Sequence, residues 1–430
     1  MKRLCFVTAI FMILGAFVGC TGTSEDKSGV ELSVVTPFCE SDGNRSNFVN
    51  AYKAYEKATG NTIIDVETES VDEKWKLNVL EQFKNGNEPD VIYFFTGADA
   101  DELIQANKFV SMSEIRSEFP EYASNMKESL MPVSTFDGRQ YAVAVYGYWE
   151  GLFVNNKVLD SCGIVMPETN YTWDQFLRDC QTIKDNGYTP IACSLAQIPH
   201  YWFEYCLFNN GSVTSHNQLP QTMDDKIAEN WVRGLNDIKE LYDRGFFPDN
   251  TNEANNDTTT DMILNDKAAF LLEGSWKVGW FQERSKSMGI DINNFAVTYV
   301  PSNGSRKTTD AVGGFSMGYC ITRSAWENPE KRKACVEFVM AMTTDEVTST
   351  FGALTVTALK NGVILPNEEL DKLAISTIEM TKGCTAMVPA AQDSLRTTAR
   401  DYLFSNISPF VKGEITAKQL VEECLKMMRK

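Results

Sequence analysis

The stretch DGRQYAVAVYGYWEGLFVNNKVLDSCG, residues 137–163, decides how the rest of the sequence is interpreted. It begins with an Asp-Gly turn and an alternating run, Gln140 to Val145, which is typical of a half-buried strand. Three aromatic residues and two glycines follow within 146–151, and a second apolar run then leads into a helix near Asn155. This pattern favours either a chain crossing between two lobes beside a ligand or a β-hairpin whose aromatic side chains pack into one core.

The N-terminus has the organisation of a secretory signal. A positively charged start precedes an apolar run over residues 4–18, which is too short to span a bilayer as a permanent helix. Phe17-Val18-Gly19-Cys20 resembles a bacterial lipobox, so residues 1–19 are predicted to be a lipoprotein signal peptide and Cys20 the lipidated mature N-terminus. An ordinary cleaved signal with an incidental cysteine is the alternative. Residues 20–29 are expected to form a flexible polar tether.

Composition excludes several classes of protein. The 430 residues are enough for two or three domains, and a hydrophobic content of 43% with 23% charged residues is that of a globular protein. A formal net charge of −18 repels phosphate backbones, so no nucleic-acid partner is expected. Of the 11 cysteines, those beyond Cys20 are scattered and form no C-x-x-C pair, and only two histidines are present. We therefore expect no zinc site, no other metal and no cofactor.

Strand and helix patterns alternate along residues 30–107. The expected strands cover 30–38, 62–68 and 89–95, and the expected helices cover 46–59, 75–83 and 102–107. This alternation predicts a doubly wound α/β arrangement. Ligands bind such sheets beyond the carboxyl ends of the strands, here Phe38 to Ser41 and Phe94 to Asp99.

The second part of the chain continues in the same way. The expected helices cover 172–186, 199–208, 226–244, 329–342 and 412–430, and the expected strands cover 188–192, 267–276, 294–301 and 311–322. Residues 250–261 form a polar loop in this interpretation, and no internal repeat is visible.

Several motifs together resemble the extracellular solute-binding proteins of ABC importers, specifically the sugar-binding group related to maltodextrin-binding protein. The resemblance covers nearly the whole mature chain, with the motifs in the same order. They are Pro89-Asp90-Val91, Tyr141 to Lys157, Thr172-Trp173-Asp174-Gln175-Phe176 after Pro167, Ala268-Ala269-Phe270 with Gly274-Ser275-Trp276, Gly313-Gly314, and Pro329 to Phe338.

The resemblance implies a type II periplasmic-binding-protein fold, with two doubly wound α/β lobes joined by a hinge and a ligand cleft between them. Lobe 1 is expected to contain residues 30–145 and 302–342, and lobe 2 residues 146–301 and 343–430. The implied function is capture of an oligosaccharide or glycoside by hinge closure, without catalysis, and its delivery to the permease subunits of an ABC importer. The protein is then a monomeric lipoprotein on the outer face of the bacterial cell membrane.

A sugar site needs flat aromatic rings for the apolar ring faces and polar side chains for the hydroxyl groups. By the resemblance, Trp276 is the leading stacking residue and Trp149 lines the floor of the cleft, beside Tyr148. Core packing is the alternative for each of these side chains. The further expected ligand contacts are Tyr201, Trp202, Phe94, Thr96, Asp99, Glu40, Ser41, Gly314 and Arg396.

Other functions stay open at this point. The same fold binding a polyamine would need acids clustered around aromatic walls, and an iron site would need adjacent tyrosines such as Tyr146 and Tyr148. Peptide binding is a further alternative. A carbohydrate-active enzyme would need two carboxylates flanking the scissile bond, and no pair is marked by its surroundings. Trp149 stands where maltodextrin binders have an acidic residue, which leaves another oligosaccharide or a smaller glycoside open.

Overall fold

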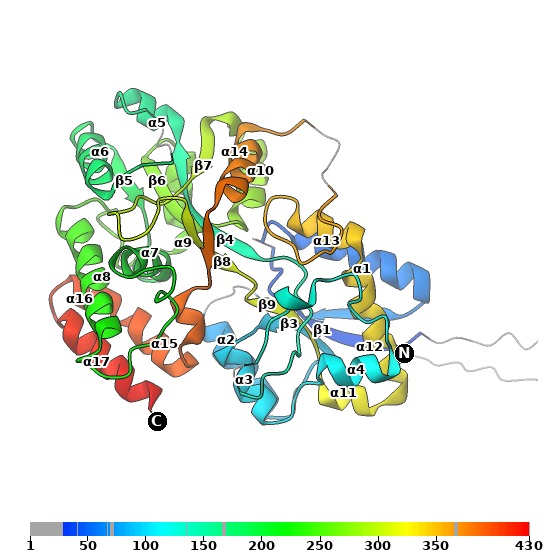
Figure 1. Ribbon diagram of the computed structural model, residues 1–430. Helices are drawn as coiled ribbons and strands as arrows, with labels where there is room; N and C mark the ends of the chain where they lie inside the picture. Colours follow the sequence, from blue (N-terminus) through cyan, green and yellow to red (C-terminus); the bar gives the residue numbers. More distant parts are fainter. Residues whose placement is uncertain are drawn as a thin grey trace, which may run out of the picture.

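The structure is a computed structural model that describes residues 29–40, 42–66, 68, 73–134, 136–165, 169–364 and 369–429. The predicted signal peptide, Cys20, most of the predicted tether, Ser41 and Pro167 lie outside these ranges. Two halves, each built around one β-sheet, lie side by side in Figure 1. No helix within the described ranges is long and apolar enough to cross a membrane.

The first half is built on a four-stranded sheet with the strand order β2-β1-β3-β9. Its strands are β1 (Glu31–Val35), β2 (Thr62–Val66), β3 (Val91–Phe95) and β9 (Met317–Ile321). β1 pairs in parallel with β2 and β3, whereas β9 runs antiparallel to β3. Because helices follow each of the three parallel strands, the alternation expected from residues 30–107 is confirmed.

Helices cover both faces of this sheet (Figure 1). The helices of this half are α1 (Arg45–Thr59), α2 (Glu73–Lys84), α3 (Ala98–Gln105), α4 (Met112–Glu118), α11 (Arg323–Glu327), α12 (Pro329–Met342) and α13 (Asp345–Gly352). Along β3, Tyr93 packs into the core shared with α1 and α12, whereas Phe94 packs into the core shared with α2 and α3. Successive side chains of a strand point to opposite faces, so this fully apolar strand is buried on both sides.

The second half is built on a six-stranded sheet with the order β10-β8-β4-β6-β5, in which β7 also pairs with β4. Its strands are β4 (Tyr148–Asn155), β5 (Thr189–Ala192), β6 (Ala268–Gly274), β7 (Phe295–Thr298), β8 (Asp310–Gly314) and β10 (Ala386–Val388). β4 is antiparallel to β6, to β7 and to β8. The stretch that decides the sequence interpretation therefore supplies the strand to which most of this sheet is attached.

The remaining helices surround the second sheet. They are α5 (Asn156–Ser161), α6 (Trp173–Asp185), α7 (His200–Asn210), α8 (Lys226–Asp243), α9 (Asn256–Leu264), α10 (Lys277–Met288), α14 (Lys372–Gly383), α15 (Thr397–Ser405), α16 (Ile407–Val411) and α17 (Ala417–Met428). The hydroxyl of Thr172 caps α6 by accepting from the backbone N–H of Gln175, as expected. The last helix begins later than expected, because Thr416 and Gln419 form a capping box at its start.

Several segments differ from the sequence expectations. The polar loop expected over 250–261 ends at Asn255, because α9 begins at Asn256. The run Gln140 to Val145 forms isolated bridges rather than a strand, such as the one between Val143 and Tyr319. β8 lies in the second sheet, since Gly313 and Gly314 pair with Trp149 and Tyr148, so this chain crossing falls between β8 and β9 rather than near residue 302. α13 lies with the first half, against α1 and α12. The expected lobe boundaries at residues 302 and 343 would place β8 in the first lobe and α13 in the second, whereas β8 pairs within the second sheet and α13 packs against the first half.

Candidate functional site

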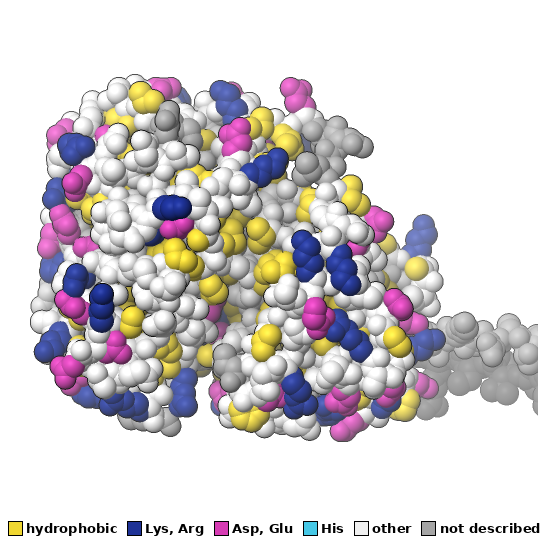
Figure 2. All heavy atoms as spheres, in the orientation of Figure 1, with side chains coloured by type: hydrophobic (Ala, Val, Ile, Leu, Met, Phe, Trp, Pro, Cys, Tyr) yellow, Lys and Arg dark blue, Asp and Glu magenta, His cyan; other side chains and the backbone are white. Residues whose placement is uncertain are grey.

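A cavity of about 430 Å³ lies between the two halves. Figure 2 shows hydrophobic side chains gathered along the boundary between the halves, where the surface is hollowed. The first half contributes the loop after β1, α2 and the carboxyl end of β3, and the second half contributes β4, the start of α7, α9 and the turn after β6. The cavity therefore lies where a parallel sheet is expected to bind ligands, beyond the ends of β1 and β3.

Aromatic rings form one concave wall of this cavity. The ring centroid of Trp276 lies 6.2 Å from that of Tyr148 and 6.0 Å from that of Tyr201, at interplanar angles of 39° and 40°. His200 extends the wall, with its ring 4.1 Å from that of Tyr201. Tilted rings at these separations leave their faces directed toward a common space, which suits the apolar face of a sugar ring.

The turn after β6 fixes the position of Trp276. Its indole N–H donates to the Glu273 carboxylate at 3.1 Å. The ring lies against the backbone of Gly274, where an added Cβ would meet the nearest ring atom at 2.1 Å. A residue with a side chain would displace the indole, so the glycine two positions before the tryptophan is a steric requirement of the site.

The opposite wall comes from the first half. Tyr93 and Phe95, both on β3, line the cavity together with Tyr146. The rings of Tyr93 and Tyr146 are nearly parallel, with centroids 6.2 Å apart. The Lys76 ammonium lies over the Phe95 ring, 3.9 Å from its centroid. The cavity thus has aromatic side chains on both sides.

Glu150 is one of the buried acids of the cavity. Its side chain is only 2% exposed, and Oε2 has no hydrogen-bond partner. The strand is firmly held at this point, because the Tyr205 hydroxyl donates to the Glu150 carbonyl oxygen at 2.6 Å and accepts from the backbone N–H of Val312. Burial, and then the negative charges of Glu204 and other nearby acids, raise the pKa of Glu150 well above its ordinary value.

Two further carboxyl groups and one imidazole have shifted pKa values. Burial raises the pKa of Asp393 and of Asp42 to about 6 each, although Lys76 opposes the shift at Asp393 and Lys277 opposes it at Asp42. Burial lowers the pKa of His200 to about 3. At neutral pH His200 is therefore uncharged, and the positive charges at the cavity are the two lysines.

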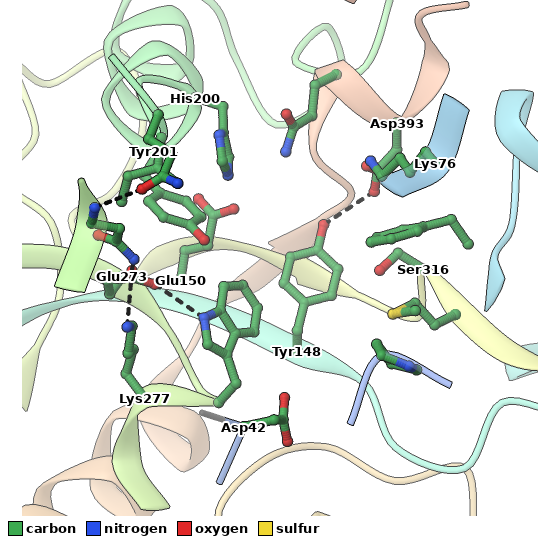
Figure 3. A pocket seen from close by; sticks show the side chains of 18 of the residues that line it. Asp42, Lys76, Tyr148, Glu150, His200, Tyr201, Glu273, Lys277, Ser316 and Asp393 are labelled. Carbon is green, nitrogen blue, oxygen red and sulfur yellow. Dashed lines mark hydrogen bonds and ion pairs between the residues drawn. The ribbon is translucent and has the colours of Figure 1, made fainter. Parts of the chain in front are cut away.

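A buried carboxylate holds the segment that carries Asp393. Glu204 accepts from the backbone N–H groups of Ala391 and Gln392, at 2.8 and 3.0 Å, and its other contact is the imidazole of His216 at 2.8 Å. These bonds fix the short 3-10 helix η3 (Ala391–Ser394) against α7. Figure 3 shows the result, with Asp393 directed toward Tyr148, whose hydroxyl donates to it at 3.4 Å.

A buried ion pair joins the two halves beside the cavity. Asp99 of α3 accepts from Arg400 of α15 at 2.5 Å and from the Thr397 hydroxyl at 2.8 Å. The Lys76 ammonium lies 3.7 Å from the same carboxylate. Burial alone would raise the pKa of Asp99, but Lys76 and Arg400 lower it below its ordinary value. We call Asp99, Thr397 and Arg400 the interlobe bridge.

The described residues contain no group of three or more His, Cys, Asp and Glu arranged to hold a metal ion. No disulfide links the nine cysteines of the described chain, and seven of them are buried. These thiols behave as small hydrophobic side chains of the core.

A family model described as "Bacterial extracellular solute-binding protein" matches residues 50–359, which is more than half of the chain. This chain is a bacterial extracellular solute-binding protein. The family places it outside the cytoplasm. No curated protein matches the sequence.

Solved structures of the same fold cover almost the whole solute-binding protein. A chitin oligosaccharide binding protein matches with a TM-score of 0.78 at 20% identity, over 94% of this chain and 98% of that one. RafE in complex with raffinose matches with a TM-score of 0.71 at 16% identity, over 93% of this chain and 98% of that one. A substrate-binding protein from Listeria monocytogenes in complex with cycloalternan matches with a TM-score of 0.71 at 13% identity, over 93% of this chain and 98% of that one. The predicted family and fold class are confirmed.

Three of the residues expected from the sequence to contact ligand line the cavity: Tyr148, Tyr201 and Trp276. Trp149 and Phe94 do not line the cavity. Each is next in sequence to lining residues of the same strand, and successive side chains of a strand point to opposite faces. Trp149 is fully buried with Phe153 on the opposite face of β4, and its indole N–H donates to the Leu354 carbonyl oxygen.

The other expected residues lie around the cavity rather than in its wall. Trp202 is buried between Phe176 and other rings of the second core. Thr96 donates its backbone N–H to Ser316, Gly314 pairs with Tyr148, and Asp99 belongs to the interlobe bridge. Glu40 and Arg396 are exposed and do not line the cavity, and Ser41 lies outside the described residues.

Sequence reasoning missed several lining residues. Those with charged or amide side chains are Asp42, Lys76, Gln197, Asn255, Asn256, Asp257, Glu273, Lys277, Gln392 and Asp393. Phe95 could have been identified from strand alternation. Phe94 and Phe95 point to opposite faces of β3, so only one of the two can face the cavity. Asp393 had no such signal, since it reaches the cavity only through the bonds that Glu204 makes to η3.

Proposed function

We propose that this solute-binding protein captures a carbohydrate, an oligosaccharide or a glycoside, and delivers it to the permease of an ABC-type importer. The observation that carries the proposal is the wall formed by Tyr148, Tyr201 and Trp276, which meets buried polar groups within one cavity. Rings stack on the apolar faces of a sugar, and carboxylates and amides bind its hydroxyl groups. The chitin oligosaccharide, raffinose and cycloalternan named for the structural neighbours support this class of ligand.

In this proposal the two halves act as lobes that close on the ligand, and no bond of the ligand is broken. The cavity is bounded by both halves, and the interlobe bridge joins them, so closure would bring these groups together. Ligand binding then shifts the population toward the closed form. Cys20 anchors the monomeric protein to the outer face of the membrane through lipid, and residues up to 29 act as the tether.

A thermal-shift screen tests the proposal. The chain from residue 20 onward, with Cys20→Ser, is heated with mono- and oligosaccharides of different composition. A ligand that binds the folded state raises Tm in proportion to the logarithm of its concentration. We expect a shift with a carbohydrate that Trp276→Ala abolishes. The matched control is Trp280→Ala, because Trp280 lies on α10, the helix directly after Trp276 in the chain, but outside the cavity wall. A panel without any carbohydrate shift would contradict the proposal.

A polyamine is the second candidate ligand. Asp42, Glu150, Glu273 and Asp393 are distributed among the aromatic walls, which is the arrangement that a polyamine would need. Spermidine therefore belongs in the same screen. A Tm shift with spermidine and with none of the sugars would retain solute binding and replace the carbohydrate.

A further inference from the structure

Glu150 presents a buried carboxylate to the cavity without a positive partner. Its Oε2 atom lacks any hydrogen bond, although the side chain is only 2% exposed. A buried polar atom left without a partner costs free energy, and the cost is larger for a charge. Figure 3 shows this side chain directed into the space between Tyr148 and Tyr201.

The nearby cations are engaged elsewhere. Lys277 lies 4.0 Å from Glu273 and 3.9 Å from Asp257, and Lys76 lies 3.7 Å from Asp99. His200 is uncharged at neutral pH because burial lowers its pKa to about 3. Within the described ranges no Lys, Arg or His forms an ion pair with Glu150. Burial, and then the negative charges of Glu204, Asp393 and Glu273, raise its pKa well above the ordinary value.

The position of Glu150 relative to the stacking wall gives the unpaired carboxylate a specific role. Tyr148 and Glu150 are two residues apart on β4 and share one face of the strand. Glu150 is paired across the sheet with Gly274, against whose backbone the Trp276 ring lies. A sugar ring stacked on Trp276 therefore holds its substituents next to the Glu150 carboxylate.

We propose that Glu150 is the recognition site for an ammonium group of the ligand, and that the ligand is a carbohydrate containing an amino sugar with a free amine. The ammonium supplies the positive charge and the hydrogen-bond donors that the buried carboxylate lacks. The inference rests on the proposed carbohydrate function and narrows it to cationic carbohydrates. A neutral sugar would offer Glu150 only hydroxyl donors and would leave the local negative charge uncompensated.

Matched probes that differ in one substituent test the proposal. The probes are glucosamine with glucose, galactosamine with galactose, and the glucosamine disaccharide with N,N′-diacetylchitobiose and cellobiose. Isothermal titration measures each Kd with the chain from residue 20 onward carrying Cys20→Ser. We expect an amine-bearing probe to bind about ten- to hundredfold more tightly than its hydroxyl or acetamide counterpart, the range typical of one charge-assisted hydrogen bond.

Two variants show whether Glu150 causes the preference. Glu150→Gln keeps the shape of the side chain and removes its charge, so we expect the amine preference to fall to within about twofold. Glu253→Gln makes the same charge change at an exposed residue outside the cavity wall, and we expect the preference to persist. The unliganded Tm of each variant reports whether it folds. If Glu150→Gln fails to fold, the wild-type comparison between matched probes decides the proposal by itself.

The outcomes separate this inference from the proposed function. Equal binding of amine-bearing and neutral probes, or a preference that survives Glu150→Gln, overturns the ammonium site and retains carbohydrate binding. Binding of spermidine with no binding of any amino sugar overturns both statements about carbohydrate. Failure of every amine-bearing probe to bind also overturns the proposal.

Discussion

Gly274→Ala is predicted to damage the site by moving one ring. The new Cβ would lie 2.1–2.4 Å from three atoms of the Trp276 indole, whereas ordinary contacts are 3.4–4 Å. The ring must therefore move by more than about 1 Å, which breaks its 3.1 Å hydrogen bond to Glu273. Overpacking of this kind costs about 1–3 kcal/mol, and we expect a value near 1 kcal/mol because Trp276 is partly exposed and has the cavity to move into.

The affinity for ligand should fall more clearly than the stability. A displaced indole loses its stacking on the sugar, and one aromatic contact contributes about 0.5–1.5 kcal/mol beyond the area that it buries. We therefore expect Gly274→Ala to weaken binding about tenfold. Isothermal titration with the carbohydrate found in the screen measures the affinity, and urea unfolding measures the stability.

A double-mutant cycle separates the ring clash from a general backbone effect. Once Trp276→Ala has removed the indole, adding Gly274→Ala should cost almost nothing further in affinity or stability. Additive losses in the double variant, or wild-type affinity in Gly274→Ala alone, would refute the argument that the glycine exists to accommodate the indole.

Three further predictions follow from the buried groups. Arg400→Met removes one side of the interlobe bridge and leaves Asp99 buried without its main partner, so ligand affinity should fall by about 2 kcal/mol, roughly thirtyfold, by titration. The unliganded chain should melt at a slightly higher Tm at pH 5 than at pH 8, because the carboxyl groups of Asp42 and Asp393, with pKa values of about 6, hold protons when folded that the unfolded chain releases from about pH 4 upward. His200 reduces this difference, because its lowered pKa of about 3 means that at pH 5 only the unfolded chain protonates the imidazole. Tyr205→Phe should lower the free energy of unfolding by about 1–3 kcal/mol in urea, because the backbone N–H of β8 loses its acceptor.

Each of these predictions has its own control. Arg244→Met removes an exposed pair with Glu240 far from the cavity, and its affinity for ligand should match the wild type. Asp393→Asn should flatten the decline of Tm between pH 5 and pH 8, and an unchanged slope would contradict the assignment of this pH dependence. For Tyr205→Phe, a free energy of unfolding equal to the wild type would show that the two hydrogen bonds of the hydroxyl contribute nothing.

The sequence predicted most of the fold because its signals are local. Apolar periodicity, the Thr172 cap and the apolar strand that ends at Phe95 are each carried by a few neighbouring residues, and the structure has elements at these places. No local signal in the sequence places β8 in the second sheet. This placement depends on the pairing of Gly313 and Gly314 with β4, more than 150 residues earlier in the chain, which no pattern within β8 indicates.

The site was less accessible to sequence reasoning. Trp276 and Tyr148, which the motifs indicated as ligand contacts, line the cavity, whereas Trp149 was expected in the cleft and the strand alternation directs it into the opposite core. Lys76 and Asp393 come from segments without a recognisable motif, and tertiary contacts alone bring them together. Residues whose neighbours set their position were predictable, and residues that depend on distant packing were not.

A crystal structure of the chain bound to the carbohydrate found in the screen tests whether the cavity between the two halves is the ligand site. We expect density for a sugar ring against the Trp276 indole, between the two halves, with a polar substituent within hydrogen-bond distance of the Glu150 carboxylate. Density for the sugar at another place on the surface, with this cavity unchanged and holding only solvent, would show that the cavity is not the ligand site.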